Sequence, residues 1–311
     1  MKKSLRYLIA LFVIFTLNFF IPRAMPGDPL ANLLGEDYVI DEASLADLRA
    51  ELGLDRPLPV QFLRYWSEIL RLDLGYSFRF HDRVTHVIGA RLPWTLLLVG
   101  SSILLGACMG TLLGAFSGWS RASLKNRTGT VLFLSVYSMP PFFLSLLLLY
   151  VFAFRLGWFP LKGVYASGEW TDILRHFFLP VMSLTLYLAA RYYLIMRGSV
   201  IQERDKAYVL YARAKGLFGR RILFRHVFKN ASLPIVTLIA LDFGFIFSGA
   251  LFVEIVFSMN GLGTLIYDAL LARDYPVLQG IFLIITVMVV VANAAADAVY
   301  PLIDPRVRKG V

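Results

Sequence analysis

The stretch Arg204–Pro234 reads RDKAYVLYARAKGLFGRRILFRHVFKNASLP and separates two long apolar runs of the chain. Its basic residues far outnumber its acid, Asp205; they are Arg204, Lys206, Arg213, Lys215, Arg220, Arg221, Arg225 and Lys229. Cytoplasmic loops of membrane proteins carry an excess of Lys and Arg, so a basic segment between two spans is expected on the cytoplasmic side. The stretch therefore predicts a polytopic membrane protein and orients one of its loops.

The same stretch predicts two short helices joined by a corner. Lys206–Lys215 contains good helix formers, and Gly216 stands where a helix would stop, because glycine adopts the left-handed C-cap conformation at little cost. A second helical segment is expected over Arg220–Asn230, and Pro234 is expected to start the next span. Small residues would give the first helix a flat face that suits docking into a partner protein. The alternative is a basic surface loop that only sets the topology.

Composition supports the membrane assignment and argues against other classes. The chain has 311 residues, of which 58% are hydrophobic and 17% charged, with a mean hydropathy of +0.66 and a net charge of +10. The basic residues cluster at the ends of apolar runs, which favours topology and contact with anionic lipid headgroups over nucleic-acid binding. The only cysteine is Cys108, the four histidines are scattered, and no GxxxxGK[ST] motif occurs. We expect no metal site, no bound cofactor and no ATP hydrolysis by this chain.

Hydropathy predicts an all-α fold with six transmembrane helices. The expected spans are Tyr7–Ile21, Leu96–Trp119, Val131–Leu156 with a break at Pro140-Pro141, Phe177–Met196, Ile235–Phe257 and Val277–Ala298. Six spans place both termini on the cytoplasmic side, where the basic loops also fall. The predicted organisation is a first helix and closing turn over residues 1–29, an extracytoplasmic segment over 30–93, and a five-helix core over 94–311 that contains a coupling loop at 198–233.

Two further patterns lie outside the basic stretch. Ala43–Leu52 and Gln61–Leu70 are predicted as short helices of the external segment. Glycines recur every four residues in the second span, on one helix face, and predict close packing against another helix; they are Gly106, Gly110, Gly114 and Gly118.

Ionisable residues inside spans are costly and tend to face a pathway or a partner. Asp242 is the main candidate for a residue of the translocation path, with Ser248 and Asn293 as further candidates. A structural hydrogen bond between helices is the alternative for Asp242. Arg191 is expected to extend toward the cytosol rather than face the interior of the bundle, and Glu254 is expected near the membrane interface.

Several motifs resemble the permease subunits of type I ABC importers, in particular the dipeptide, oligopeptide and nickel branch. They are Met25-Pro26-Gly27-Asp28-Pro29, Arg91-Leu92-Pro93-Trp94-Thr95, Ala212-Arg213-Ala214-Lys215-Gly216 followed by Leu233-Pro234, Arg273-Asp274-Tyr275-Pro276, and Asp304-Pro305-Arg306. The general family pattern begins its loop with Glu-Ala-Ala and has a shorter gap before Leu-Pro. This sequence departs from that pattern as the peptide and nickel branch does.

The resemblance implies an inner-membrane subunit of an ATP-driven importer. It would pair with a second, homologous permease and two ATP-binding subunits that carry ATP and Mg, and an extracytoplasmic binding protein would deliver the substrate. The implied contact with the ATPase is made by Ala207, Tyr208, Tyr211, Ala212, Arg213, Ala214, Lys215, Gly216, Leu217 and Phe218.

Peptides are the first expectation for the substrate, with nickel or metal chelates and oligosaccharides as alternatives inside the same class. Two other classes stay open from the residues alone. One is an ion-coupled carrier that works by itself, for which Asp242 would be central; the other is a structural or regulatory membrane protein that recruits a cytosolic partner through its basic loop.

Overall fold

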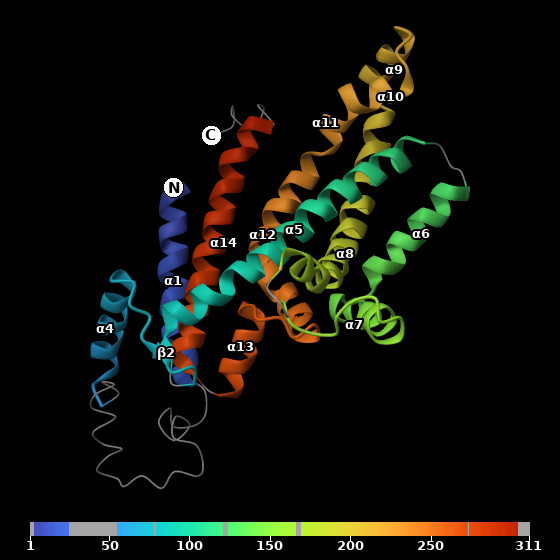
Figure 1. The fold of residues 1–311 in the computed structure, drawn as a ribbon. Coiled ribbons are helices and arrows are strands. Elements are labelled where there is room, and N and C mark those ends of the chain that lie inside the picture. The colour runs from blue at the N-terminus through green and yellow to red at the C-terminus, as the bar shows by residue number, and fades with distance from the viewer. Residues whose placement is uncertain are drawn as a thin grey trace. The chain divides into compact units, whose positions relative to one another are not determined.

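The computed structural model describes residues 3–24, 55–77, 79–120, 124–165, 169–272 and 274–303 and is mostly helical (Figure 1). Within these ranges the strands form a single short antiparallel pair, β1 (Tyr76–Ser77) with β2 (Asp82–Arg83). The predicted all-α class is therefore confirmed. The chain divides into two compact units, one formed by residues 1–93 and 261–290 and the other by residues 94–260 and 291–311.

Within the described residues, the first unit contains five helical elements or parts of them. They are α1 (Lys3–Ala24), α4 (Leu58–Leu70), the beginning of α5 (Val84–Trp119), α13 (Leu262–Leu271) and the larger part of α14 (Tyr275–Ile303). Rings join α4 to α1: Trp66 lies 5.4 Å from Phe12, and Phe62 lies 5.2 Å from Phe19, between ring centroids. Burying aromatic rings between two helices supplies a large contact area for such a short helix. The predicted helix over 61–70 is confirmed, whereas the one predicted over 43–52 lies outside the described residues.

Asp274 organises the beginning of α14 in this unit. Asp274 is 1% exposed, and its Oδ2 accepts hydrogen bonds from the Ser77 hydroxyl at 2.5 Å and the Arg79 amide at 3.3 Å. Its Oδ1 accepts from the Val277 amide at 3.3 Å, in the manner of a helix N-cap. One carboxylate thus fastens the β1–β2 hairpin to the start of a long helix.

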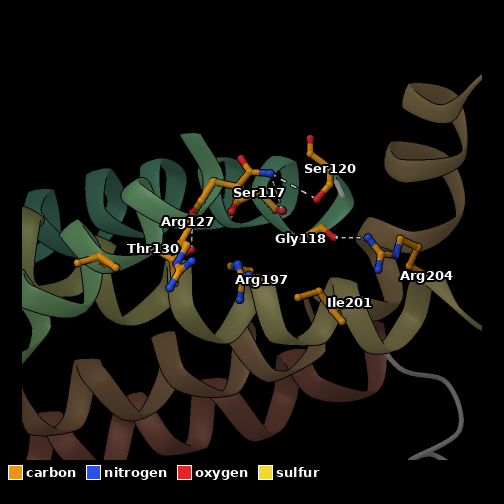
Figure 2. Close-up of a pocket in the computed structure, with 10 residues that line it drawn as sticks. Ser117, Gly118, Ser120, Arg127, Thr130, Arg197, Ile201 and Arg204 are labelled. Carbon is orange, nitrogen blue, oxygen red and sulfur yellow. Dashed lines mark hydrogen bonds between the residues drawn. The ribbon is translucent and has the colours of Figure 1, made fainter. Parts of the chain in front are cut away.

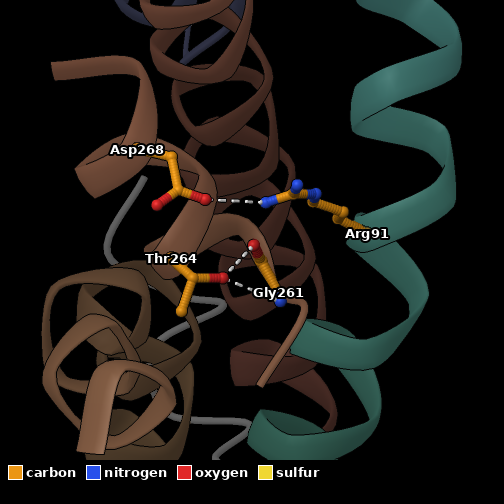
Figure 3. Close-up of polar contacts among 4 residues, drawn as sticks. All are labelled: Arg91, Gly261, Thr264 and Asp268. Carbon is orange, nitrogen blue, oxygen red and sulfur yellow. Dashed lines mark hydrogen bonds and ion pairs between the residues drawn. The ribbon is translucent and has the colours of Figure 1, made fainter. Parts of the chain in front are cut away.

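We expect Asp274→Ala to lower the stability of the first unit by about 1–3 kcal/mol, because it removes the cap and leaves buried donors without acceptors. The matched control is Asp268→Ala, since Asp268 is about half exposed and pairs with Arg91 at 3.5 Å (Figure 3). Exposed pairs contribute little, so the control should change stability by less than about 1 kcal/mol. Thermal unfolding of the purified protein in detergent measures both, and equal losses would contradict this role of Asp274.

The second unit contains the rest of α5 and the helices that follow it. They are α6 (Leu124–Ser138), α7 (Pro141–Leu148), the π-helical η1 (Leu149–Arg155), α8 (Trp170–Arg204), α9 (Ala207–Ala214), α10 (Gly219–Ile222), the π-helical η2 (Leu223–Val227), α11 (Phe228–Ala231) and α12 (Leu233–Val256). Helix α8 packs against α6, α7 and α12, so it is central to this unit.

The glycine stripe of α5 lies directly against α8. A Cβ atom added to Gly110 would lie 2.5 Å from the carbonyl oxygen of Ala189, and one added to Gly114 would lie 2.6 Å from that of Tyr193. Gly106 and Gly118 repeat this close approach one turn away on either side. The predicted packing role of the stripe is confirmed, because only glycine lets the two backbones come this near.

We expect Gly114→Ala to destabilise the second unit by about 1–3 kcal/mol, since the new methyl group would overlap backbone atoms that cannot move aside. Gly100→Ala on the same helix is the matched control, because a Cβ there meets nothing within 4 Å. The amount of folded protein after extraction and its melting temperature report the difference. Similar values for the two variants would contradict the close packing of α5 on α8.

Among the residues that the structure describes, three helices are long and apolar enough to cross a membrane: α5, α8 and the part of α14 over Tyr275–Ala295. Two bent pairs raise the number of spans to as many as five within the described residues. These pairs are α6 with α7 and η1, bent by 104°, and α10–α11 with the first half of α12, bent by 48°. Helix α1 contains a shorter apolar segment, Tyr7–Phe20, at the place of the predicted first span.

Several predicted boundaries were wrong, and the structure gives a physical reason for each. The second helix begins at Val84 and continues through Pro93, because Val84 and Ile88 pack closely against Gly280 of α14. The break at Pro140-Pro141 is confirmed. The bend of 104° between α6 and the α7–η1 segment is far larger than the expected proline kink, because each proline keeps the residue before it out of the helical conformation. Helix α13 was not predicted; Leu262, Leu265 and Ala269 form its buried face.

Candidate coupling surface and polar clusters

The predicted docking segment forms a helix and a corner at the end of α8. Helix α9 begins after Lys206, whose backbone is extended, and its C-cap is Lys215. Gly216 follows with φ of +77°, and its amide donates to the Arg213 carbonyl at 2.9 Å. Such a positive φ is strained for any residue with a Cβ, so the corner depends on glycine. The predicted helix and its glycine stop are confirmed.

The two sides of α9 differ in exposure. Val209 and Ala212 are buried in the chain's own interior, whereas Tyr211 is 63% exposed and Phe218, after the corner, is 83% exposed. Of the predicted contact residues, most are exposed: Ala207, Tyr211, Arg213, Ala214, Lys215, Gly216 and Phe218. Tyr208 and Leu217 are intermediate, and Ala212 packs against its own chain. Together with Leu210, the exposed members form an apolar and basic surface, which we call the coupling surface.

Contacts with three helices hold the coupling surface in place. The Arg213 guanidinium lies 5.4 Å from the ring of Trp119, the last residue of α5. The Tyr208 hydroxyl donates to Glu203 of α8 at 2.7 Å and accepts from Asn230 of α11 at 3.5 Å. Burial and the hydrogen bond to Glu203 raise the pKa of Tyr208, which keeps its hydroxyl protonated as a donor. The surface is therefore mechanically tied to the ends of α5 and α8.

The second arm of the segment packs its apolar residues inward. Ile222, Leu223, Val227 and Ala231 are fully buried, at a spacing that puts them on one side of the α10–η2–α11 run. Phe224 of η2 meets Phe116 of α5 at 5.5 Å between ring centroids. The predicted second helix is thus confirmed, and it leads directly into α12, where Pro234 stands in the first turn.

An ionic cluster joins α8 to α12. Arg191 forms an ion pair with Asp242 Oδ1, and the Tyr192 hydroxyl donates to Asp242 Oδ2 at 2.6 Å. The Asp242 side chain is 7% exposed and that of Arg191 is 27% exposed. The expectation that Arg191 extends toward the cytosol was wrong, because an acidic partner lies within reach on the neighbouring helix. Asp242 makes the hydrogen bonds between helices that the alternative reading expected.

The other polar candidates are Asn293, Ser248 and Glu254. Asn293 is partly buried in α14, and no hydrogen bond links it to Asp242 in the described part of the chain. Ser248 belongs to α12, but its side chain lies outside what the structure describes. Glu254, expected near the interface, is fully buried and accepts a hydrogen bond from Thr95 of α5 at 2.6 Å. This pair was not predicted, although Thr95 closes the RLPWT motif.

Comparison with known proteins decides the family. The sequence profile described as binding-protein-dependent transport system inner membrane component matches residues 110–309, which is well over half of the chain. A companion profile for the N-terminal part of such proteins matches residues 1–99. The chain belongs to this family.

Relatives match this inner-membrane component over nearly its whole length. A Brucella ovis protein named as a peptide permease is 37% identical over 310 residues, which is 97% of both chains. A Sinorhizobium fredii protein named as a peptide ABC transporter permease is 33% identical over 291 residues, covering 93% of this chain and 92% of its own. The glutathione transport system permease of Pectobacterium atrosepticum is 34% identical over 307 residues, covering 99% and 97%. The family and these relatives identify a type I ABC importer permease of the peptide branch, a transport subunit in a membrane.

Proposed function

We propose that this permease forms, with a second and homologous permease, the path by which peptides enter the cell. The proposal rests on its full-length similarity to proteins named as peptide and glutathione permeases, glutathione itself being a small peptide. A binding protein outside the membrane delivers the substrate, and two ATP-binding subunits drive the cycle. This chain binds no cofactor; ATP and Mg bind to the partner subunits.

The coupling surface is proposed as the contact with an ATP-binding subunit. Its exposed apolar side chains, above all Tyr211 and Phe218, suit a cleft in a partner, because large rings carry much of the energy of protein contacts. Closure of the ATPases on binding ATP would move α9, and the contacts of Trp119 and Glu203 would transmit this motion to α5 and α8. The spans would then alternate between outward and inward access.

Peptides are preferred as substrates over nickel chelates and oligosaccharides because of the names of the relatives. Asp242, Ser248 and Asn293 are retained as proposed residues of the path. The pairing of Asp242 with Arg191 favours a role in which the pair changes partners or solvent access during the cycle, rather than one in which Asp242 holds a substrate by itself.

The proposed orientation follows from the basic loops. Both termini and the coupling surface lie in the cytoplasm, and the segment that contains α4 lies outside, facing the binding protein. A cysteine introduced at Phe218 should react with a membrane-impermeant thiol reagent only after the membrane is opened, whereas one at Leu63, which is 70% exposed on α4, should react in intact cells.

The decisive experiment is purification of the chain from native membranes in mild detergent, with mass spectrometry of everything that accompanies it. We expect an ATP-binding subunit, a second permease and a binding protein that carries a peptide. Recovery of the chain alone, from a preparation that still transports, would contradict the importer assignment and favour an ion-coupled carrier.

A further inference from the structure

A pocket of about 580 Å³ lies in the second unit where α5 ends and α6 begins, beside the last turns of α8 (Figure 2). Its polar lining comes from all three helices and includes Ser117, Asn126, Thr130 and three arginines, Arg127, Arg197 and Arg204. The Tyr193 hydroxyl hydrogen-bonds to Ser117 Oγ at 2.7 Å and to Thr130 Oγ1 at 3.1 Å, which fixes the three helices around the pocket. The pocket is therefore a built feature of the unit.

In the part of the chain that the structure describes, the positive charge of this pocket is only partly neutralised. Within the described ranges, neither Arg127 nor Arg197 forms an ion pair, and Arg204 meets only the exposed Asp205, at 3.6 Å. The sequence contains no Asp or Glu between Asp82 and Glu169, so the loop that joins α5 to α6 brings no acid. Guanidinium groups that share a concave site without a counterion favour binding of an anion.

The arginines also keep hydrogen-bond donors unused. Arg204 donates through Nη1 to the Gly118 carbonyl at 3.3 Å, but the Nε atoms of Arg197 and Arg204 are buried and have no hydrogen-bond partner in the described structure. Buried donors without acceptors cost free energy. A phosphate group presents oxygens that the planar guanidinium group of arginine can bind in pairs, so it would satisfy these donors.

An apolar surface continues from the pocket along α6. Val131 and Ile201 line its wall, and the outward side chains of Leu124, Val131 and Leu132 are 83%, 56% and 63% exposed. A basic pocket that opens onto exposed aliphatic side chains matches a molecule with an anionic head and hydrocarbon tails. This arrangement favours a lipid over a soluble phosphate compound.

We propose that this pocket, formed by α5, α6 and α8, binds the phosphate group of an anionic phospholipid at the membrane surface. Arg127, Arg197 and Arg204 hold the phosphate, and the acyl chains lie along α6. Arg204 stands two residues before Lys206, the N-cap of α9, and it donates to the carbonyl of Trp119, whose ring contacts Arg213. A bound lipid would thus brace the base of the coupling surface.

The test is lipid retention by the intact transporter complex purified with its partners. The complex is placed in nanodiscs of phosphatidylcholine with an increasing fraction of phosphatidylglycerol and is then extracted into mild detergent. Native mass spectrometry measures how much phosphatidylglycerol stays bound to it. Arg127→Gln/Arg197→Gln is compared with Arg225→Gln/Lys229→Gln, which removes the same charge from exposed positions outside the pocket. We expect the pocket variant to lower the affinity for phosphatidylglycerol by about tenfold or more, and the control to retain it.

Four outcomes would overturn the proposal. Equal loss in both variants would indicate a general charge effect, and unchanged retention in the pocket variant would exclude the site. Retention of inorganic phosphate by the complex in nanodiscs of pure phosphatidylcholine, without a preference for phosphatidylglycerol, would exclude a lipid as the source of the phosphate group. A crosslink between the pocket and a segment of a partner subunit would also exclude a lipid as the occupant. If the double variant does not assemble, Arg127→Gln alone serves, because Arg127 is exposed and forms no ion pair with any described residue.

Discussion

Replacement of both Tyr211 and Phe218 with aspartate is expected to abolish ATP-driven uptake while the permease still inserts and folds. The two side chains are 63% and 83% exposed in the isolated chain, so their removal leaves the interior of the protein unchanged. Central aromatic residues of an interface contribute about 2–4 kcal/mol each, so the affinity for the ATP-binding subunit should fall by roughly 100-fold or more. Uptake of labelled peptide into proteoliposomes, with co-purification of the ATPase, measures both effects.

The control for this variant is Leu161→Asp, which places a charge on an exposed apolar residue in the 156–165 loop, away from the coupling surface. The control should retain the ATP-binding subunits at the wild-type level. If the Tyr211/Phe218 variant also retains them and transports normally, the coupling surface is not the contact with the ATPase.

Replacement of Asp242 with alanine is expected to reduce the stability of the second unit by about 3 kcal/mol. It leaves the Arg191 guanidinium between helices without its counterion, and breaking a buried pair from one side costs about 3–5 kcal/mol. We place the effect at the lower end because about a quarter of the Arg191 side chain is exposed. The yield of folded protein and its melting temperature in detergent are the measurements.

The double variant Arg191→Met/Asp242→Leu distinguishes a structural pair from a transport residue. Removing both charges should restore most of the stability lost in Asp242→Ala, because no unpaired charge is left inside. If the pair takes part in the cycle, the stable double variant will transport poorly; if it only holds α8 to α12, uptake will return with stability. No loss of stability in Asp242→Ala would contradict the geometry of the cluster.

The sequence predicts the helices of this protein well because apolar runs, prolines and glycines act locally. Gly216 stops α9, Pro234 opens α12, and the four-residue glycine repeat faces another helix, each for a reason visible in neighbouring residues. The extent of α5 before Pro93 was not predictable in this way, since it depends on contact with Gly280, nearly two hundred residues away.

The polar clusters show the limit of the same reasoning. Arg191 and Asp242 lie in successive spans and carry opposite charges, which was a signal that they pair. The signal was missed because each span was interpreted by itself. The pair of Thr95 with Glu254 had no comparable signal, because only the fold brings α5 and α12 together there. Likewise, the sequence could not show that Ala212 faces inward while Tyr211 faces outward.

The central claim is that the coupling surface contacts an ATP-binding subunit, and site-specific photo-crosslinking from Phe218 tests it most directly. A photoreactive amino acid at position 218 in the native membrane should give a crosslink to the ATP-binding subunit that changes when ATP is bound. The same amino acid at Leu161 should not give this product. Crosslinks from position 218 to lipid alone, or none to an ATPase in a transporting membrane, would contradict the account.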